Sequence, residues 1–241
     1  MHPERLVWIW ATRTDRDKAF FSIPDYADYR RATTTLQDVA AYASWGVNLT
    51  GGGNLERLQG AKVTAGAFSA LGVSAGVGRT LVATDDVPGA DRIVVVTDAL
   101  WRRRFGGARG IVGSRVQLNG EEYEVVGVLP KEFLFPGLEA ELYAPIAMER
   151  DPRRFDRGTN FLRVFGRLRP EGTLAQVRDE WGGRFLQRLP RAGCIEDCTD
   201  HLTDAEMYAR LLWCSCSTSL LSATCTARRM RPHLFRRKGR K

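Results

Sequence analysis

The sequence predicts an α+β fold, in which strand hairpins and short helices are mixed along the chain. Two local signals support this class: an Asn119-Gly120 hairpin turn, and several Ser/Thr-x-x-Asp/Gln capping boxes that open helices. Helices and strands do not alternate regularly, as they would around a parallel sheet. The hydrophobic fraction of 44% over 241 residues is enough to bury a substantial core.

Over the first sixty residues, the sequence predicts a strand, two helices and the start of a hairpin. Residues 6–10 are apolar and aromatic, which indicates a buried strand. Ser22 and Asp25 have capping-box spacing and predict a helix that ends near Ala32. Thr35 and Asp38 repeat this spacing, so a second helix is predicted over residues 39–42.

The middle of the chain predicts two strands of a hairpin, a helix, a buried strand and another helix. Glycines at 51–53 lie between residues 47–50 and 58–63, which are predicted to pair as a hairpin. Thr64 is expected to start a short helix that ends at Gly72. Residues 93–96 are all Ile or Val, which is typical of a buried strand. Thr97 then serves as the N-cap of a helix that ends at Gly106.

The remaining elements are predicted mainly as strands. Residues 116–118 and 123–128 flank Asn119-Gly120 and form the clearest hairpin. Pro145 lacks a ladder donor, so residues 142–145 are expected to form an edge strand. In residues 162–168, Leu, Val, Gly and Leu alternate with Arg, Phe and Arg. This pattern predicts a strand with one packed face and one face partly exposed to solvent. Thr173 and Gln176 form a capping box for a helix with apolar positions at Leu174, Val177, Trp181 and Phe185.

Charge and cysteine divide the chain near residue 184. Residues 184–241 hold 12 of the 36 Lys and Arg but only 5 of the 28 Asp and Glu, which gives this segment a net charge of +7. The preceding 183 residues carry a net charge of only +1, so the globular part lacks the excess of positive charge that binding to a nucleic-acid backbone requires. All five cysteines also lie after residue 184, at 194, 198, 214, 216 and 225.

Several segments, in order and spacing, resemble the MacB-like periplasmic core domain of MacB-type and FtsX-type ABC transporter permeases. Each segment alone is a weak signal, but together they span residues 3–183. They are residues 3–10, 22–26, 49–53, 56–64, 68–73, 78–80, 100–107, 111–113, 118–130 and 166–173.

The resemblance implies the fold in more detail. It implies a porter-like mixed α/β subdomain with a smaller β-rich subdomain inserted at about residues 108–150. An irregular or disordered tail is expected over residues 184–241. The family would place membrane helices before residue 3 and after about residue 200. We therefore interpret the chain as truncated at both ends, and its tail as read out of frame.

The resemblance also implies a mechanical, non-catalytic function. In such systems ATP hydrolysis by a separate ABC ATPase subunit moves membrane helices, and the extracytoplasmic domain couples that motion to export or signalling. The implied partners are a second permease unit, as a homodimer or a paired half, and the ATPase. The implied location is the periplasmic side of the inner membrane, with the membrane contacted only through helices missing from this chain. Expressed as given, the chain is expected to stay in the cytoplasm.

No catalytic, cofactor-binding or metal-binding residue is predicted. Histidines occur only at positions 2, 201 and 233, so a Ser/His/Asp triad lacks a positioned base. The five tail cysteines and His201 lack the paired spacing of structural zinc ligands. Two alternatives stay open: a cation site at the acidic pairs and a phosphate site at an arginine run. These residues are Asp85-Asp86, Glu121-Glu122 and Arg102-Arg103-Arg104.

Two other function classes remain as rival hypotheses. One is a free-standing soluble binding module. The other is a nucleic-acid-binding protein that acts through the basic tail, although no nucleic acid is expected as a partner from the nearly neutral body. A hydrolase would require a residue cluster that the sequence does not predict.

Overall fold

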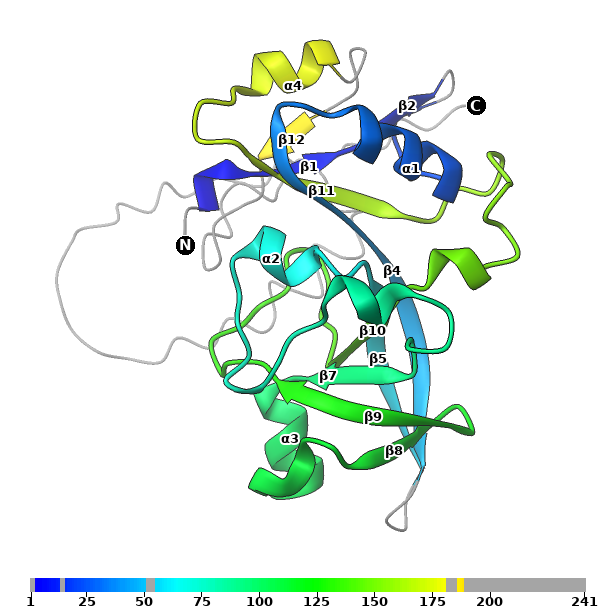
Figure 1. Cartoon of the computed structure of the whole chain (residues 1–241), viewed down its shortest axis with the longest axis vertical. Helices are drawn as coiled ribbons and strands as arrows, with labels where there is room; N and C mark the ends of the chain where they lie inside the picture. The colour runs from blue at the N-terminus through cyan, green and yellow to red at the C-terminus, as the bar shows by residue number, and fades with distance from the viewer. Residues whose placement is uncertain (1–2, 14–15, 51–54, 181–185, 189–241) are drawn as a thin grey trace, which may run out of the picture. The chain divides into compact units, whose positions relative to one another are not determined.

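One large sheet organises the part of the chain that the computed structural model describes, which is residues 3–13, 16–50, 55–180 and 186–188. The sheet has ten strands in the order β12-β1-β11-β4-β5-β10-β7-β9-β6, and β8 pairs with both β4 and β9 (Figure 1). Helices pack against its faces, so the predicted α+β class is confirmed. All described residues fall within one structural unit, Met1–Asp197.

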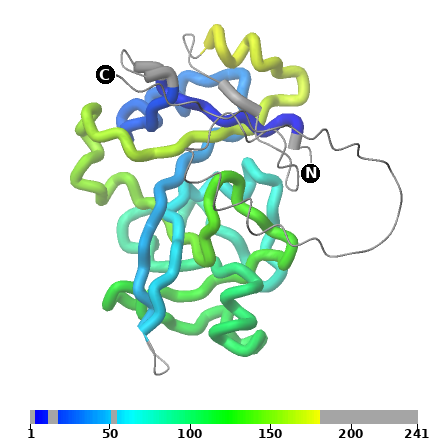
Figure 2. The backbone as a smooth tube through the Cα atoms, turned by 180° about the vertical axis from the view of Figure 1, so that it is seen from behind, coloured from blue at the N-terminus to red at the C-terminus, as the bar shows by residue number. Residues whose placement is uncertain are grey.

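The longest strand, β4 (Leu36–Thr50), connects the two ends of this sheet (Figure 2). Its first half pairs with β11 (Arg163–Leu168), and its second half pairs with β5 (Glu56–Val63). The helix predicted over residues 39–42 is therefore wrong. The capping-box spacing is present, but β11 pairs with this segment along one edge, and on the other edge the amide and carbonyl of Ala41 bond to Thr64. Alanines at 40 and 41 are fully buried against opposite faces of the sheet.

Helices α1 (Ile23–Ala32) and α4 (Leu174–Glu180) cover one face of β1 (Leu6–Ile9), β11 and β4. The predicted cap of α1 is confirmed, because the Ser22 hydroxyl accepts a hydrogen bond from the Asp25 amide at 3.2 Å. The capping box of α4 is also confirmed. The Thr173 hydroxyl accepts a hydrogen bond from the backbone amide of Gln176, and the side-chain oxygen of Gln176 accepts one from the backbone amide of Thr173. The predicted positions Trp181 and Phe185 of this helix lie outside the described residues.

Helix α2 (Ala67–Leu71) packs on the opposite face and starts three residues later than predicted. Thr64 is used differently, since its hydroxyl accepts a hydrogen bond from the Ala41 amide of β4 at 3.0 Å. Beneath α2 lies a set of interlocking rings that we call the aromatic cluster. Its members are Trp8, Tyr42, Phe68, Phe133, Phe135, Tyr143 and Phe165.

At the other end of the sheet, the strand pairings close into a ring in the order β4-β5-β10-β7-β9-β8. The ring contains β7 (Ile93–Val96), β8 (Arg115–Leu118), β9 (Glu121–Val128) and β10 (Leu142–Pro145). Its apolar interior is filled from every strand and by Leu100 of helix α3 (Asp98–Phe105). The predicted Thr97 cap and the Gly106 terminus of α3 are confirmed.

The β8–β9 hairpin is confirmed at the predicted turn. Asn119 has φ 52° and Gly120 has φ 81°, the left-handed values that a two-residue hairpin turn requires. The predicted hairpin of residues 47–50 and 58–63 is also confirmed as β4 and β5, although its glycine tip lies outside the described residues. The proposed inserted subdomain at residues 108–150 would include β8, β9 and β10, and its boundaries stay a prediction.

Two strand predictions are corrected. Strand β10 is central, because it pairs with β5 on one side and β7 on the other. Pro145 is tolerated there since β7 pairs only with Leu142 and Tyr143, and the ladder on that side has ended before the proline. Strand β11 is more buried than predicted: Phe165 and Arg167, on the face expected to be partly exposed to solvent, are buried.

Strands β1 and β12, the first and last strands along the described chain, lie side by side at one edge of the sheet. Strand β12 (Leu186–Arg188) pairs antiparallel with β1, with Val7 opposite Arg188. The tail predicted to be irregular from residue 184 therefore includes one strand of the sheet, and the prediction is corrected at these residues. Three smaller strands complete the described structure: β2 (Ala11–Arg13) and β3 (Arg16–Ala19) pair with each other, and β6 (Val77–Gly78) pairs with β9. Among the helices of the described residues, none has the length and apolar character needed to cross a membrane.

Glu180, the last residue of α4, fastens this helix to the turn between α1 and β4. Its carboxylate accepts hydrogen bonds from the hydroxyls of Thr33 and Thr34 and from the amides of Thr34 and Thr35. Burial opposes ionisation, but these donors together lower the pKa of Glu180 to about 2. The carboxylate is therefore charged in the folded domain at neutral and mildly acidic pH.

We expect Glu180→Gln to lower the free energy of unfolding by about 1 kcal/mol at pH 7, since the carboxylate is largely solvated and screened. The pKa of Glu180 is lower in the folded state than in the unfolded state, so its ionised carboxylate stabilises the folded domain above pH 4.5. This contribution fades as the pH falls toward 2. Urea unfolding of both proteins between pH 7 and pH 2.5 measures the difference. Glu171→Gln, an exposed neighbour before α4, is the control; a pH-independent difference would contradict the assignment.

Candidate functional site

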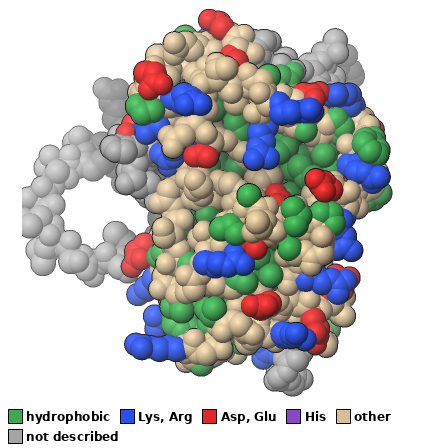
Figure 3. Space-filling model, in the orientation of Figure 1, with side chains coloured by type: hydrophobic (Ala, Val, Ile, Leu, Met, Phe, Trp, Pro, Cys, Tyr) green, Lys and Arg blue, Asp and Glu red, His purple; other side chains and the backbone are tan. Residues whose placement is uncertain are grey.

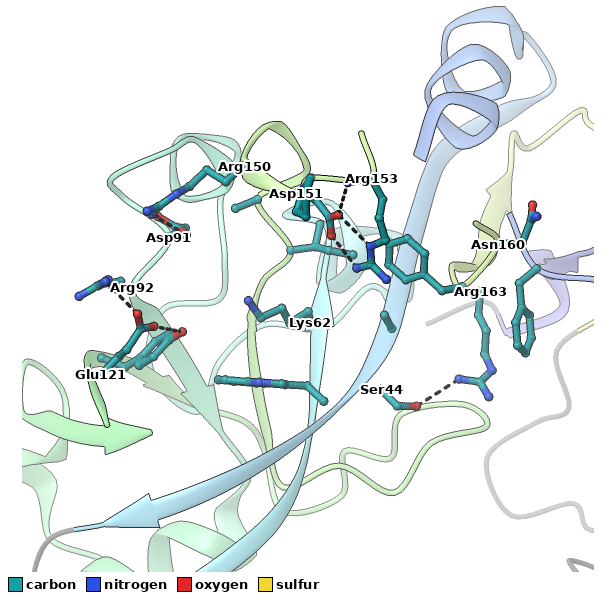
Figure 4. Close-up of a pocket in the computed structure, with 18 residues that line it drawn as sticks. Ser44, Lys62, Asp91, Arg92, Glu121, Arg150, Asp151, Arg153, Asn160 and Arg163 are labelled. Atoms are coloured by element: carbon teal, nitrogen blue, oxygen red, sulfur yellow. Dashed lines mark hydrogen bonds and ion pairs between the residues drawn. The ribbon is translucent and has the colours of Figure 1, made fainter. Parts of the chain in front are cut away.

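The described surface contains a broad groove with a volume of about 760 Å³. Its walls come from β4 and β5, from the segment before β7, from the start of β9 and from the irregular chain between β10 and β11 (Figure 4). The residues that line it are Phe20, Ala43, Ser44, Trp45, Lys62, Asp91, Arg92, Glu121, Tyr123, Ile146, Ala147, Arg150, Asp151, Pro152, Arg153, Asn160, Phe161 and Arg163.

Each of the three carboxylates in the groove is paired with an arginine. Asp91 pairs with Arg150 at 3.0 Å, and Glu121 pairs with Arg92 at 3.1 Å. Asp151 accepts two bonds from the Arg153 guanidinium, at 2.6 and 2.8 Å. The same guanidinium lies over the Phe161 ring, 3.6 Å from its centre. The Asp91–Arg150 pair joins the loop before β11 to the segment before β7, and the Asp151–Arg153 pair lies within that loop.

Three titratable groups of the groove have shifted pKa values. Bonds from Arg153 lower the pKa of Asp151. Burial acts to raise the pKa of Asp91, but the Gly89 amide and Arg150 hold it below its ordinary value. Burial raises the pKa of the Tyr123 hydroxyl. All three pKa values move away from neutrality, which is the opposite of what general acid–base catalysis needs.

Two cations in the groove have no carboxylate within ion-pair distance among the described residues. The Lys62 ammonium lies 5.3 Å from the centre of the Trp45 ring, and its charge helps to lower the pKa of Asp151. The Arg163 guanidinium donates to the Ser44 hydroxyl at 3.2 Å and lies 4.7 Å from the Phe20 ring centre. The groove is therefore positive and partly aromatic, a combination suited to an acidic ligand.

The two acidic pairs that were considered as a cation site instead form ion pairs and hydrogen bonds within the fold. Asp85 forms a two-point ion pair with Arg79 and accepts the Val82 amide. Asp86 accepts the amides of Ala65 and Ala147, which joins the start of α2 to the end of β10. Glu121 and Glu122 bind different arginines, Arg92 and Arg115. No group of three or more metal-ligating side chains occurs in the described ranges.

The arginine run of α3 is also occupied by carboxylates. Arg102 pairs with Asp98 at 2.7 Å, and Arg103 bridges Glu56 and Glu141 at 2.6 and 2.7 Å. These contacts attach α3 to the strand ring and leave no open cradle for phosphate. Beyond this helix, acidic and basic side chains are interspersed over the face in Figure 3. The cysteines and histidines considered for zinc or a triad lie outside the described residues.

The groove was not predicted from the sequence, because its residues come from segments that are far apart in the chain. Arg150 and Asp91, for example, are 59 positions apart. One signal was available: residues 149–157 alternate acids and arginines without strand or helix periodicity. Such a charged loop beside buried strands indicates a surface that is held in place by ion pairs.

Solved structures with similar folds include an extracellular domain, a periplasmic region and a permease domain of transport proteins. The extracellular domain of the noncanonic transporter YknZ from Gram-positive bacteria matches with TM-score 0.54 and 19% identity, over 73% of this chain and 88% of that one. The periplasmic region of MacB from Actinobacillus actinomycetemcomitans matches with TM-score 0.56 and 16% identity, over 82% and 92%. A domain of a putative permease from Porphyromonas gingivalis matches with TM-score 0.58 and 14% identity, over 79% and 93%. No curated protein matches significantly.

The family match places the chain in the class of periplasmic domains of ABC transporter permeases. The family model of the MacB-like periplasmic core domain matches residues 2–183. The chain therefore belongs to the family of MacB-like periplasmic core domains, as the sequence resemblance predicted.

Proposed function

We propose that this domain transmits force on the periplasmic side of a permease. It couples ATP-driven movement of membrane helices to export or signalling, and it catalyses no reaction itself. In the intact system it works in a permease dimer, or beside a paired permease half, with a separate ABC ATPase subunit at the inner membrane. Family membership over residues 2–183 supports this assignment.

The observation that carries the proposal is the pairing of β1 with β12. A domain inserted between two membrane helices must receive and return the chain at the same place. Because β1 and β12 are antiparallel neighbours, with Val7 opposite Arg188, the chain enters and leaves at one edge of the sheet. Two helices attached there would pull on adjacent strands, and hydrogen bonds would carry the pull through β11 to β4.

The location is tested by placing residues 3–188 between the first two membrane helices of a cysteine-free MacB-type permease. This segment contains no cysteine, so Phe155→Cys, at a side chain 80% exposed, supplies the single thiol. We expect a membrane-impermeant maleimide to label this thiol in intact cells. Labelling only after lysis would contradict a periplasmic location.

The mechanical role is tested in the same chimera. A flexible Gly-Ser spacer between the first membrane helix and residue 3 should abolish export but leave ATP hydrolysis intact. The control is an equal spacer inserted in the exposed β8–β9 turn at Gly120, which should preserve export. Equal export with both spacers would contradict force transmission through β1.

A further inference from the structure

One edge of β4 is open where the strand passes through the groove. On this side β11 pairs with β4 only as far as Tyr42, and β8 begins to pair only at Leu49. The opposite edge is covered by β5 from Tyr42 to Leu49. A gap of a few residues therefore separates the two partners of this edge.

The backbone groups that face this gap belong to Ser44 and Gly46. The amide and carbonyl of Ala41 bond to Thr64 on the β5 side, and those of Asn48 bond to Asn119 on the β8 side. Strand residues alternate in direction, so Ser44 and Gly46 share the direction of Asn48. Both residues are exposed, and within the described ranges no strand pairs with them on this side.

Of the two cations without a carboxylate, Arg163 lies on β11 beside this open edge, whereas Lys62 lies on β5, across β4 from the edge, with its side chain on the opposite face of the sheet. Arg163 stands opposite Tyr42, so it shares the face of Ser44, to which it donates. Lys62 stands opposite Ala43 and shares the other face with Trp45. Figure 4 shows Lys62 and Arg163 on the two sides of the β4 ribbon, with Ser44 beside Arg163.

We propose that this gap binds an extended acidic peptide of a partner protein, which adds to the sheet as a short strand along Ser44 and Gly46. Backbone hydrogen bonds to β4 would supply sequence-independent affinity. Side chains of the added strand alternate between the faces, so two consecutive acidic residues would approach Arg163 on one face and Lys62 on the other. The proposal rests on the groove itself and does not depend on the transport role.

The edge pairing is tested with the full chain and a set of fluorescein-labelled hexapeptides that share a central Glu-Asp pair. Fluorescence anisotropy at low salt should detect binding by the wild-type protein. The same peptides with central Lys-Lys, or with N-methyl groups on alternate amides, should bind at least about tenfold more weakly. Equal binding by the N-methylated peptides would overturn strand addition, and no binding by any acidic peptide would overturn the proposal.

The charge requirement is tested with Lys62→Gln and Arg163→Gln. We expect each substitution to weaken binding about fivefold and the pair to weaken it about twentyfold. Arg109→Gln, an exposed arginine of the 3-10 helix Arg109–Ile111, is the matched control and should change binding less than twofold. Unchanged affinity in the double variant would overturn the proposal. So would inorganic phosphate that protects Lys62 and Arg163 from modification while no peptide binds.

Discussion

We expect Phe165→Ala to lower the free energy of unfolding by about 3–5 kcal/mol, because it removes the centre of the aromatic cluster. Phe165 is 1% exposed and contacts Trp8, Tyr42 and Phe135, with ring centres 5.9–6.3 Å apart. The cavity would lie between α2 and three strands, where a backbone paired on both edges cannot collapse into it. In a domain of this size the melting temperature should fall on the order of 10 °C.

Urea unfolding followed by circular dichroism measures this loss. The matched control is Phe155→Ala, which removes the same atoms from a side chain that is 80% exposed, and we expect a change within about 0.5 kcal/mol. Similar losses for the two variants would show that Phe165 does not pack as described.

The second large effect is expected at Gly127, where β9 touches the chain after β6. A Cβ atom at Gly127 would lie 2.1 Å from the backbone oxygen of Arg79. The two segments cannot separate easily, since the Arg79 amide donates to Val126 at 2.9 Å and the Arg79 side chain binds Asp85. We therefore expect Gly127→Ala to cost about 3 kcal/mol or more.

Hydrogen exchange and thermal melting test this substitution. Exchange should increase first in β6 and β9, because the contact that is broken joins these strands. Gly110→Ala is the control: no atom lies within 4 Å of its Cβ position, and its φ is not positive. A Gly127→Ala protein as stable as the Gly110→Ala protein would refute the close approach.

Local elements were predicted from sequence where the signal and its effect lie within a few residues. The caps at Ser22, Thr97 and Thr173 each form their bonds within three positions, and the turn at Asn119-Gly120 joins residues that pair three positions apart, Leu118 and Glu121. The cap predicted at Thr35 failed because strand partners more than a hundred residues away in the chain, on β11, decide the conformation of that segment. Tertiary pairing overrides a local signal when both edges of the backbone are satisfied by it.

The groove was beyond prediction from sequence for a related reason. Nothing in the sequence marks Lys62 and Arg163 as different from the other basic residues. Their character depends on which carboxylates the fold brings near them and which it assigns to Arg92, Arg150 and Arg153. An unmatched charge is a property of the assembled structure, so it becomes visible only when every other ion pair has been placed.

Strand β4 contributes side chains to each of the three apolar clusters of the domain: Ala40 and Tyr42 to the first, Val39 and Ala41 to the second, and Val47 and Leu49 to the third. If β4 detaches, every cluster loses a wall at the same moment. The clusters therefore cannot melt one after another. A domain built in this way unfolds as one cooperative body, and under load it holds its form until it yields all at once.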